Sequence, residues 1–410
     1  MKLFPNTTNY QIYFGKMLTQ TAKPTFYIIK PFNSSEVAET LWKYMRNLTS
    51  YQHGIIDILK ERRLNQREKI IEAYQIKYNQ DLVSDLKSSL PVKFEDDIVT
   101  LTTLPRSLDD YAKELHLAIF SSQSNEKVIN ASISILMKHS ADQRINIAEA
   151  YKTLYKQDLL SDLKIKSTGK QEDIIVALMT PLPDFYAKEL HDSMLGLGTD
   201  EDTIIEILFT LSNEVIMSTD VSYEKLYGRT LQNDLIDDTS GYFKQLLVFI
   251  ANGRREMNQG IDYNQAKVDA EALFTVDERK WVSDQSKFKG ILGTRSYQHL
   301  RQTFIEYKNI SGHEIEEAIN GKSFSTDFKK GLLEIVKYAK SKIDFFAERL
   351  HDSIGINDRA LIRIIVTRRE IDLKDIKEAY QERYKTSLES RINKKIFGAH
   401  KDLLLLLVSK

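Results

Sequence analysis

The chain repeats itself, and a repeat of fixed length limits the possible folds more than any other feature of this sequence. A segment that reads EAYQIKY at 72–78 returns as EAYKTLY at 149–155 and as EAYQERY at 378–384. Weaker copies end at Tyr227 and near Tyr307, so five copies follow one another at steps of 72 to 80 residues. A unit of about 75 residues has room for five short helices and is too long for a HEAT or TPR unit.

The composition favours helices for these units. The 410 residues include only 16 glycines and 7 prolines, about half of the ordinary share. A β-sandwich, barrel or propeller needs more turn formers than this. Each copy also carries apolar residues at helical spacing, for example at 204–208 and 361–365. With 42% apolar residues the chain can bury a large core. We therefore expect an all-α fold of five repeats.

Charge and cysteine content exclude several classes of function. Lysine plus arginine equals aspartate plus glutamate at 58 each, so no global attraction draws the chain to nucleic acid or anionic lipid. The sequence has no cysteine, which removes thiolate chemistry and fits a reducing compartment. The longest apolar run, 403–408, is far short of a membrane span, and no signal-peptide pattern is visible. We expect a soluble, cytoplasmic protein that binds no nucleic acid.

The repeats divide the chain into a tail and five similar units. The tail at 1–33 is rich in threonine and aromatic residues and could bind a partner or be phosphorylated, although an arm packed on the body is favoured. The expected units are 34–104, 108–180, 183–252, 265–338 and 340–410.

One inter-helix loop has the composition of an ion site. The third copy reads MLGLGTDE from Met194 to Glu201, and two glycines two positions apart allow carbonyl oxygens to turn toward one point. Calcium accepts such neutral oxygens together with a carboxylate. Asp238, separated from Thr199 by thirty-eight residues, could supply it if the helices pair side by side. From the residues alone, a Gly-x-Gly turn that merely ends a helix remains the commoner alternative.

The motif resembles a known site. Gly196 to Thr199, followed by thirty-eight residues and an acid, is similar to the type II calcium site of the annexins, and the repeat of about 75 residues resembles the annexin repeat. Copies two to five resemble the four annexin repeats in order, most clearly at 159–164, 290–296 and 370–373. The chain is identified as a divergent annexin, similar to protist members such as the alpha-giardins. The resemblance implies right-handed superhelical repeats in a curved array.

The resemblance also implies a function and its residues. Calcium would be bound by the main-chain oxygens of Met194, Gly196 and Gly198 and by both carboxylate oxygens of Asp238. A weaker neighbouring site would use the Thr199 carbonyl and the Glu201 carboxylate. The expected protein is not an enzyme; it docks peripherally on acidic phospholipid at the inner face of membranes through a calcium bridge.

The chain departs from the family pattern in two ways. Annexins usually carry four or eight repeats, and four of the five loops here are degraded. Where the carboxylate belongs, the first, second, fourth and fifth copies carry Ser89, Lys166, Lys322 and Lys395. A lysine at this position repels a cation, so we expect one intact site. A cytoskeleton-associated or scaffold protein with little calcium-dependent lipid binding is the alternative function. The sequence makes no prediction of oligomeric state.

Three further features carry weaker expectations. Glu95 and Glu172 resemble the carboxylate of a secondary annexin loop site, although an ordinary surface glutamate is favoured for each. Trp281 lies where some annexins place a tryptophan that enters the membrane interface, whereas Trp42 is expected to be a packing residue. His116, His191 and His351 recur in similar contexts and are explained by duplication rather than by metal binding.

Overall fold

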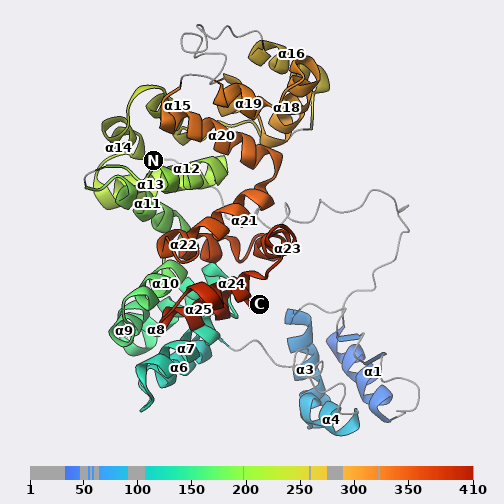
Figure 1. The fold of residues 1–410 in the computed structure, drawn as a ribbon. Helices are drawn as coiled ribbons and strands as arrows, with labels where there is room; N and C mark the ends of the chain where they lie inside the picture. The colour runs from blue at the N-terminus through green and yellow to red at the C-terminus, as the bar shows by residue number, and fades with distance from the viewer. Residues whose placement is uncertain are drawn as a thin grey trace, which may run out of the picture. The chain divides into compact units, whose positions relative to one another are not determined.

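The computed structural model describes most of the chain, and every regular element in the described part is a helix. The described residues are 33–46, 54–55, 58–59, 64–90, 107–196, 198–257, 260–274, 290–321 and 324–409. They form two compact units, 1–106 and 107–410 (Figure 1). Within those described ranges, no helix combines the length and the apolar character that crossing a membrane requires. The all-α prediction is confirmed.

The first unit contains the extra copy. Its described helices are α1 (Ser34–Arg46), α3 (Leu64–Tyr78) and α4 (Leu82–Ser89). They enclose a small core to which Leu41 and Ile70 contribute. The Trp42 ring stacks on the Tyr78 ring at 5.0 Å with an interplanar angle of 6°, which confirms the packing role expected for Trp42.

The second unit contains the other four copies. The second copy is made of α6 (Leu108–Ile119), α7 (Asn125–Leu136), α8 (Ala141–Tyr155), α9 (Leu159–Lys166) and α10 (Lys170–Met179). The third is made of α11 (Leu182–Ser193), α12 (Glu201–Thr210), α13 (Asn213–Tyr227), α14 (Leu231–Asp238) and α15 (Gly241–Ala251). The fourth is made of α16 (Tyr263–Phe274), the π-helix η3 (Gly290–Thr294), α18 (Tyr297–Ser311), α19 (Ile315–Asn320) and α20 (Thr326–Lys340). The fifth is made of α21 (Lys342–Ser353), α22 (Asp358–Arg368), α23 (Leu373–Tyr384), α24 (Leu388–Lys395) and α25 (His400–Val408).

The four copies of this unit pack in pairs that the chain order does not reveal. One apolar core is shared by the second and fifth copies, where α10 lies against α22. A second core is shared by the third and fourth copies, where α12 and α15 both lie against α20 (Figure 1). The second copy therefore packs against a partner more than two hundred residues away in the sequence.

The recurring tyrosine segment and the recurring histidine are explained by one hydrogen-bonded chain. In the second copy, His116 Nδ1 lies 3.1 Å from the hydroxyl of Tyr151, which donates to Asp162 at 2.8 Å. The third copy repeats this arrangement, and in the fifth His351 Nδ1 lies 3.1 Å from the Tyr380 hydroxyl. Each of these polar side chains gains a partner inside its own repeat, so the histidines have a structural role.

Candidate functional site

The loop between α11 and α12 has a backbone that depends on its two glycines. Gly196 and Gly198 have φ angles of +98° and +97°, a region that side-chain-bearing residues rarely adopt. Beyond them the chain closes when the Asp200 amide donates to the Ser193 carbonyl at 2.8 Å. Asp200 then caps α12 by accepting from the Thr203 amide at 3.1 Å. The loop is therefore a built turn that projects between two capped helices; Leu197 lies outside the described residues.

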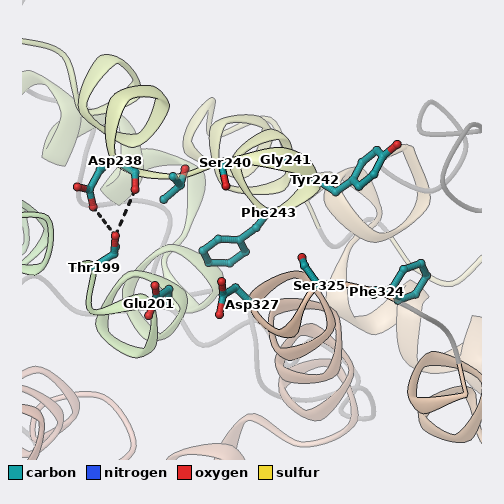
Figure 2. A pocket seen from close by; sticks show the side chains of 11 residues that line it. Thr199, Glu201, Asp238, Ser240, Gly241, Tyr242, Phe243, Phe324, Ser325 and Asp327 are labelled. Atoms are coloured by element: carbon teal, nitrogen blue, oxygen red, sulfur yellow. Dashed lines mark hydrogen bonds between the residues drawn. The ribbon is translucent and has the colours of Figure 1, made fainter. Parts of the chain in front are cut away.

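The distant aspartate returns to this loop. Asp238 is the last residue of α14, and α14 lies against α11. The hydroxyl of Thr199 donates to Asp238 Oδ2 at 2.7 Å and lies 3.2 Å from its carbonyl oxygen (Figure 2). The carboxylate is thus placed at the glycine turn in the absence of any ion. Glu201 begins α12 directly after the loop.

A pocket of about 450 Å³ lies beside this contact, between the third and fourth copies. Thr199, Glu201 and Asp238 form one side of it, and Asp327 from the first turn of α20 lies on the other (Figure 2). Tyr242, Phe243 and Phe324 complete its apolar part. The sequence did not identify Asp327 as part of this region, because an acid in the first turn of a helix is ordinarily explained by the helix dipole.

The donor set fits calcium. Within the described ranges no three His, Asp or Glu side chains gather closely enough to hold a metal, so an ion here would depend on main-chain oxygens. The turn at Met194, Gly196 and Gly198 offers those oxygens, and Asp238 offers the carboxylate. Calcium accepts an irregular set of neutral and charged oxygens, whereas magnesium requires a tighter octahedron.

The acid next to Glu201 is already engaged. Asp202 lies 2.7 Å from Arg349 and 2.5 Å from Lys330. Burial opposes the charge of Asp202, but these two cations outweigh burial and hold its pKa below the ordinary value. Asp202 is therefore part of the packing between copies, and Glu201 and Asp238 remain the carboxylates next to the loop.

The corresponding positions of the other copies differ as the sequence indicates. Lys166 and Lys395 end α9 and α24, where Asp238 ends α14. Glu172 pairs with Lys164 at 3.2 Å, which agrees with a surface glutamate. Ser89 ends α4, but the loop that would face it lies outside the described residues, as do Glu95, Trp281 and Lys322.

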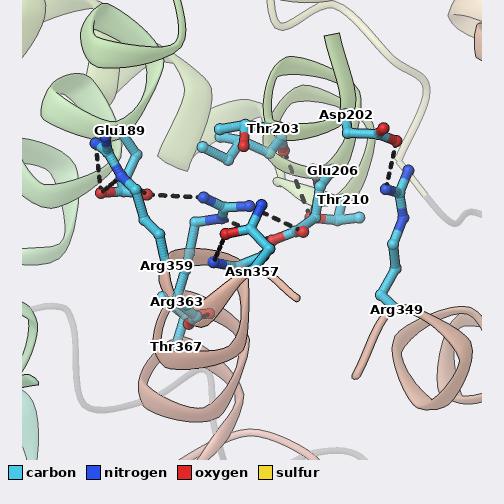
Figure 3. Close-up of polar contacts among 12 residues, drawn as sticks. Glu189, Asp202, Thr203, Glu206, Thr210, Arg349, Asn357, Arg359, Arg363 and Thr367 are labelled. Atoms are coloured by element: carbon cyan, nitrogen blue, oxygen red, sulfur yellow. Dashed lines mark hydrogen bonds and ion pairs between the residues drawn. The ribbon is translucent and has the colours of Figure 1, made fainter. Parts of the chain in front are cut away.

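A second polar cluster joins the third and fifth copies. Arg363 of α22 is 1% exposed and donates to Glu206 at 2.8 and 3.0 Å and to Glu189 at 2.7 Å (Figure 3). Arg359 reaches Glu189 at 2.9 Å and Asp192 at 2.6 Å. Burial disfavours the charge on Arg363, but the two glutamates outweigh it and raise the pKa of the guanidinium. Nothing in the sequence pairs these residues, which lie more than 150 positions apart.

Comparison with known proteins now identifies the family. The profile of the family described as Annexin matches five segments, 36–101, 110–178, 185–250, 268–335 and 345–407. The chain belongs to the annexin family. The resemblance found in the sequence is thereby confirmed, although the unit boundaries given above stay predictions.

Individual annexins show how far the similarity extends. Rat annexin A5 is 41% identical over 278 residues, which cover 67% of this chain and 87% of that protein. Rat annexin A6 is 40% identical over 297 residues, which cover 72% of this chain and 44% of annexin A6, so the chain spans less than half of that relative. The solved structure of annexin III matches with a TM-score of 0.70 and 37% identity over 75% of this chain and 95% of annexin III.

A solved structure of calcium-bound alpha-1 giardin matches with a TM-score of 0.61 and covers 74% of this chain and 99% of that one. At 19% identity this likeness concerns the fold alone. Annexins in general are non-enzymatic proteins that bind phospholipid in a calcium-dependent manner. That general property is where the assignment of this chain's own site begins.

Proposed function

We propose that this annexin docks peripherally on acidic phospholipid through a calcium ion held by the third copy. The hydrogen bond from Thr199 to Asp238 carries the proposal, because it holds the carboxylate beside the glycine turn before calcium arrives. The ligands would be the main-chain oxygens of Met194, Gly196 and Gly198 and the carboxylate of Asp238. The Thr199 carbonyl and Glu201 would form the weaker neighbouring site.

The charge of the chain explains why an ion is needed. A chain with no net charge and an anionic leaflet attract each other little, and a dication between them supplies the attraction. A site with one carboxylate binds calcium weakly by itself, and lipid phosphate oxygens raise the apparent affinity by linkage. Leu195, which is 60% exposed next to the turn, would meet the lipid interface at the same place. Docking at the inner face of a membrane follows if the chain is cytoplasmic.

The test is sedimentation of the full chain with vesicles. With phosphatidylserine vesicles, we expect the pelleted fraction to rise with calcium and to return to its starting value when a chelator is added. Phosphatidylcholine vesicles are the control and should show no such rise. A pelleted fraction that ignores calcium would refute the proposal and favour the cytoskeletal or scaffold alternative.

Trp281 gives an independent optical test. The chain has two tryptophans, so in a Trp42→Phe variant, which keeps an aromatic ring against Tyr78, all indole emission comes from Trp281. If Trp281 enters the interface, its emission shifts to the blue when calcium and phosphatidylserine vesicles are both present, because the ring leaves water. Unchanged emission under conditions where the protein pellets would remove Trp281 from the membrane contact.

A further inference from the structure

The fifth copy keeps the shape of the calcium loop but replaces the acid. Its α21–α22 loop turns at Gly355, which has a φ of +80°. A Cβ at Gly355 would lie 3.5 Å from both the Cβ and the carbonyl oxygen of Lys395. Lys395 ends α24 as Asp238 ends α14. The glycine turn and the end of the fourth helix therefore meet in both copies, with a carboxylate in one and an ammonium in the other.

Apolar side chains project from the two segments that meet there. Ile356 is 85% exposed and Phe397 is 76% exposed, whereas their neighbours Ile354 and Ile396 are each 3% exposed. The core is thus already filled by one residue of each segment, and the other residue stands in water. Exposing large apolar side chains is costly, so two of them on adjoining segments indicate a surface that meets an apolar phase.

Positive charge accompanies these side chains. Lys394 and Lys395 are exposed, and neither pairs with a carboxylate in the part of the chain that the structure describes. Asp358, the closest acid to Ile356 in the sequence, faces Lys170 at 3.6 Å and His400 at 3.7 Å. The two ammonium groups are therefore uncompensated where the apolar side chains project.

We propose that Ile356, Lys394, Lys395 and Phe397 form a membrane contact, here named the fifth-copy patch, that binds anionic lipid without calcium. The ammonium groups take the place of the ion and meet lipid phosphates, while Ile356 and Phe397 enter the acyl boundary. Lysines suit this depth because their stems lie in apolar surroundings and their charge stays at the headgroups. This contact goes beyond the function proposed above, because it needs neither calcium nor Asp238.

The contact is expected to be weak. A basic residue near an anionic leaflet contributes an attraction worth roughly a fivefold change in partition, so removing both lysines should lower partition about 30-fold. Removing Ile356 and Phe397 should lower it roughly tenfold or more. Salt should weaken the contact, because exposed charges are screened within about 10 Å at 0.1 M.

Flotation of the full chain in a chelator tests the proposal. We expect binding to phosphatidylserine vesicles at millimolar lipid and low salt, and none to phosphatidylcholine vesicles. Lys394→Gln with Lys395→Gln, and separately Ile356→Ser with Phe397→Ser, should each lose it. The matched controls, Lys225→Gln with Lys374→Gln and Met217→Ser with Val221→Ser, alter exposed residues elsewhere and should bind as the parent does.

Three results would overturn the fifth-copy patch: no binding of the parent chain in chelator, binding that survives both double substitutions, or binding that depends on the lysines but ignores Ile356 and Phe397. The last would indicate general charge attraction or an acidic protein partner. These results are separable from a failure of the calcium site, because an Asp238 substitution should leave binding in chelator unchanged and affect only the increment that calcium adds.

Discussion

Asp238→Asn should abolish calcium-dependent sedimentation with phosphatidylserine vesicles at calcium concentrations that saturate the parent chain. Asparagine keeps the shape and can still accept the hydrogen bond from Thr199, so the loop should keep its fold. It removes the one negative charge among ligands that are otherwise neutral carbonyl oxygens. Because ligand charge tunes calcium affinity over orders of magnitude, we expect the calcium needed for half-maximal pelleting to rise about 100-fold or more.

The matched control lies one residue away. Asp237→Asn changes the net charge by the same amount, and Asp237 is an exposed partner of Arg229 rather than of the loop. This variant should pellet like the parent. A second readout needs no lipid: millimolar calcium should raise the melting temperature of the parent and of Asp237→Asn, since a ligand that binds only the folded state stabilises it. Equal responses of Asp237→Asn and Asp238→Asn would show that calcium binds elsewhere.

Arg363→Met should destabilise the fold by about 3–5 kcal/mol, the largest stability effect that we expect from a single substitution here. The guanidinium lies between Glu206 and Glu189, both 5% exposed. Methionine fills similar volume but leaves the Glu206 carboxylate buried without its two hydrogen bonds. Breaking a buried ion pair on one side costs far more than the pair itself contributes, because the remaining charge stays desolvated. Denaturant unfolding followed by circular dichroism measures the change.

Arg383→Met is the control for this prediction. Arg383 lies 3.4 Å from Glu348 but its side chain is 47% exposed, and exposed pairs contribute about 0–1 kcal/mol. The same chemical change should therefore shift the unfolding midpoint little. Adding Glu206→Gln to Arg363→Met should recover part of the loss, since the amide removes the unpaired charge. If Arg363→Met were no worse than Arg383→Met, the cluster would not hold the third and fifth copies together.

The local part of the fold was readable from the sequence. The spacing of apolar residues predicted the helices, and the recurrence of EAY segments predicted five similar units, because both depend on contacts within about 75 residues. The candidate site was readable for the same reason: the glycine turn and Asp238 lie in one repeat, and helices of one repeat pack on one another. The family resemblance then identified the ligands that calcium would use, which geometry by itself left open.

What the sequence alone determined was therefore each repeat and the chemistry inside it. The tertiary structure decided which repeats share a core, which acids are already paired, and where Lys395 lies. Asp202 and Asp327 have the same ordinary place in the sequence, near a helix start, yet one is held by Arg349 and Lys330 and the other lines the pocket beside Asp238. The physical reason is that contacts between copies join residues more than a hundred positions apart, and no local spacing records which surfaces will be buried together.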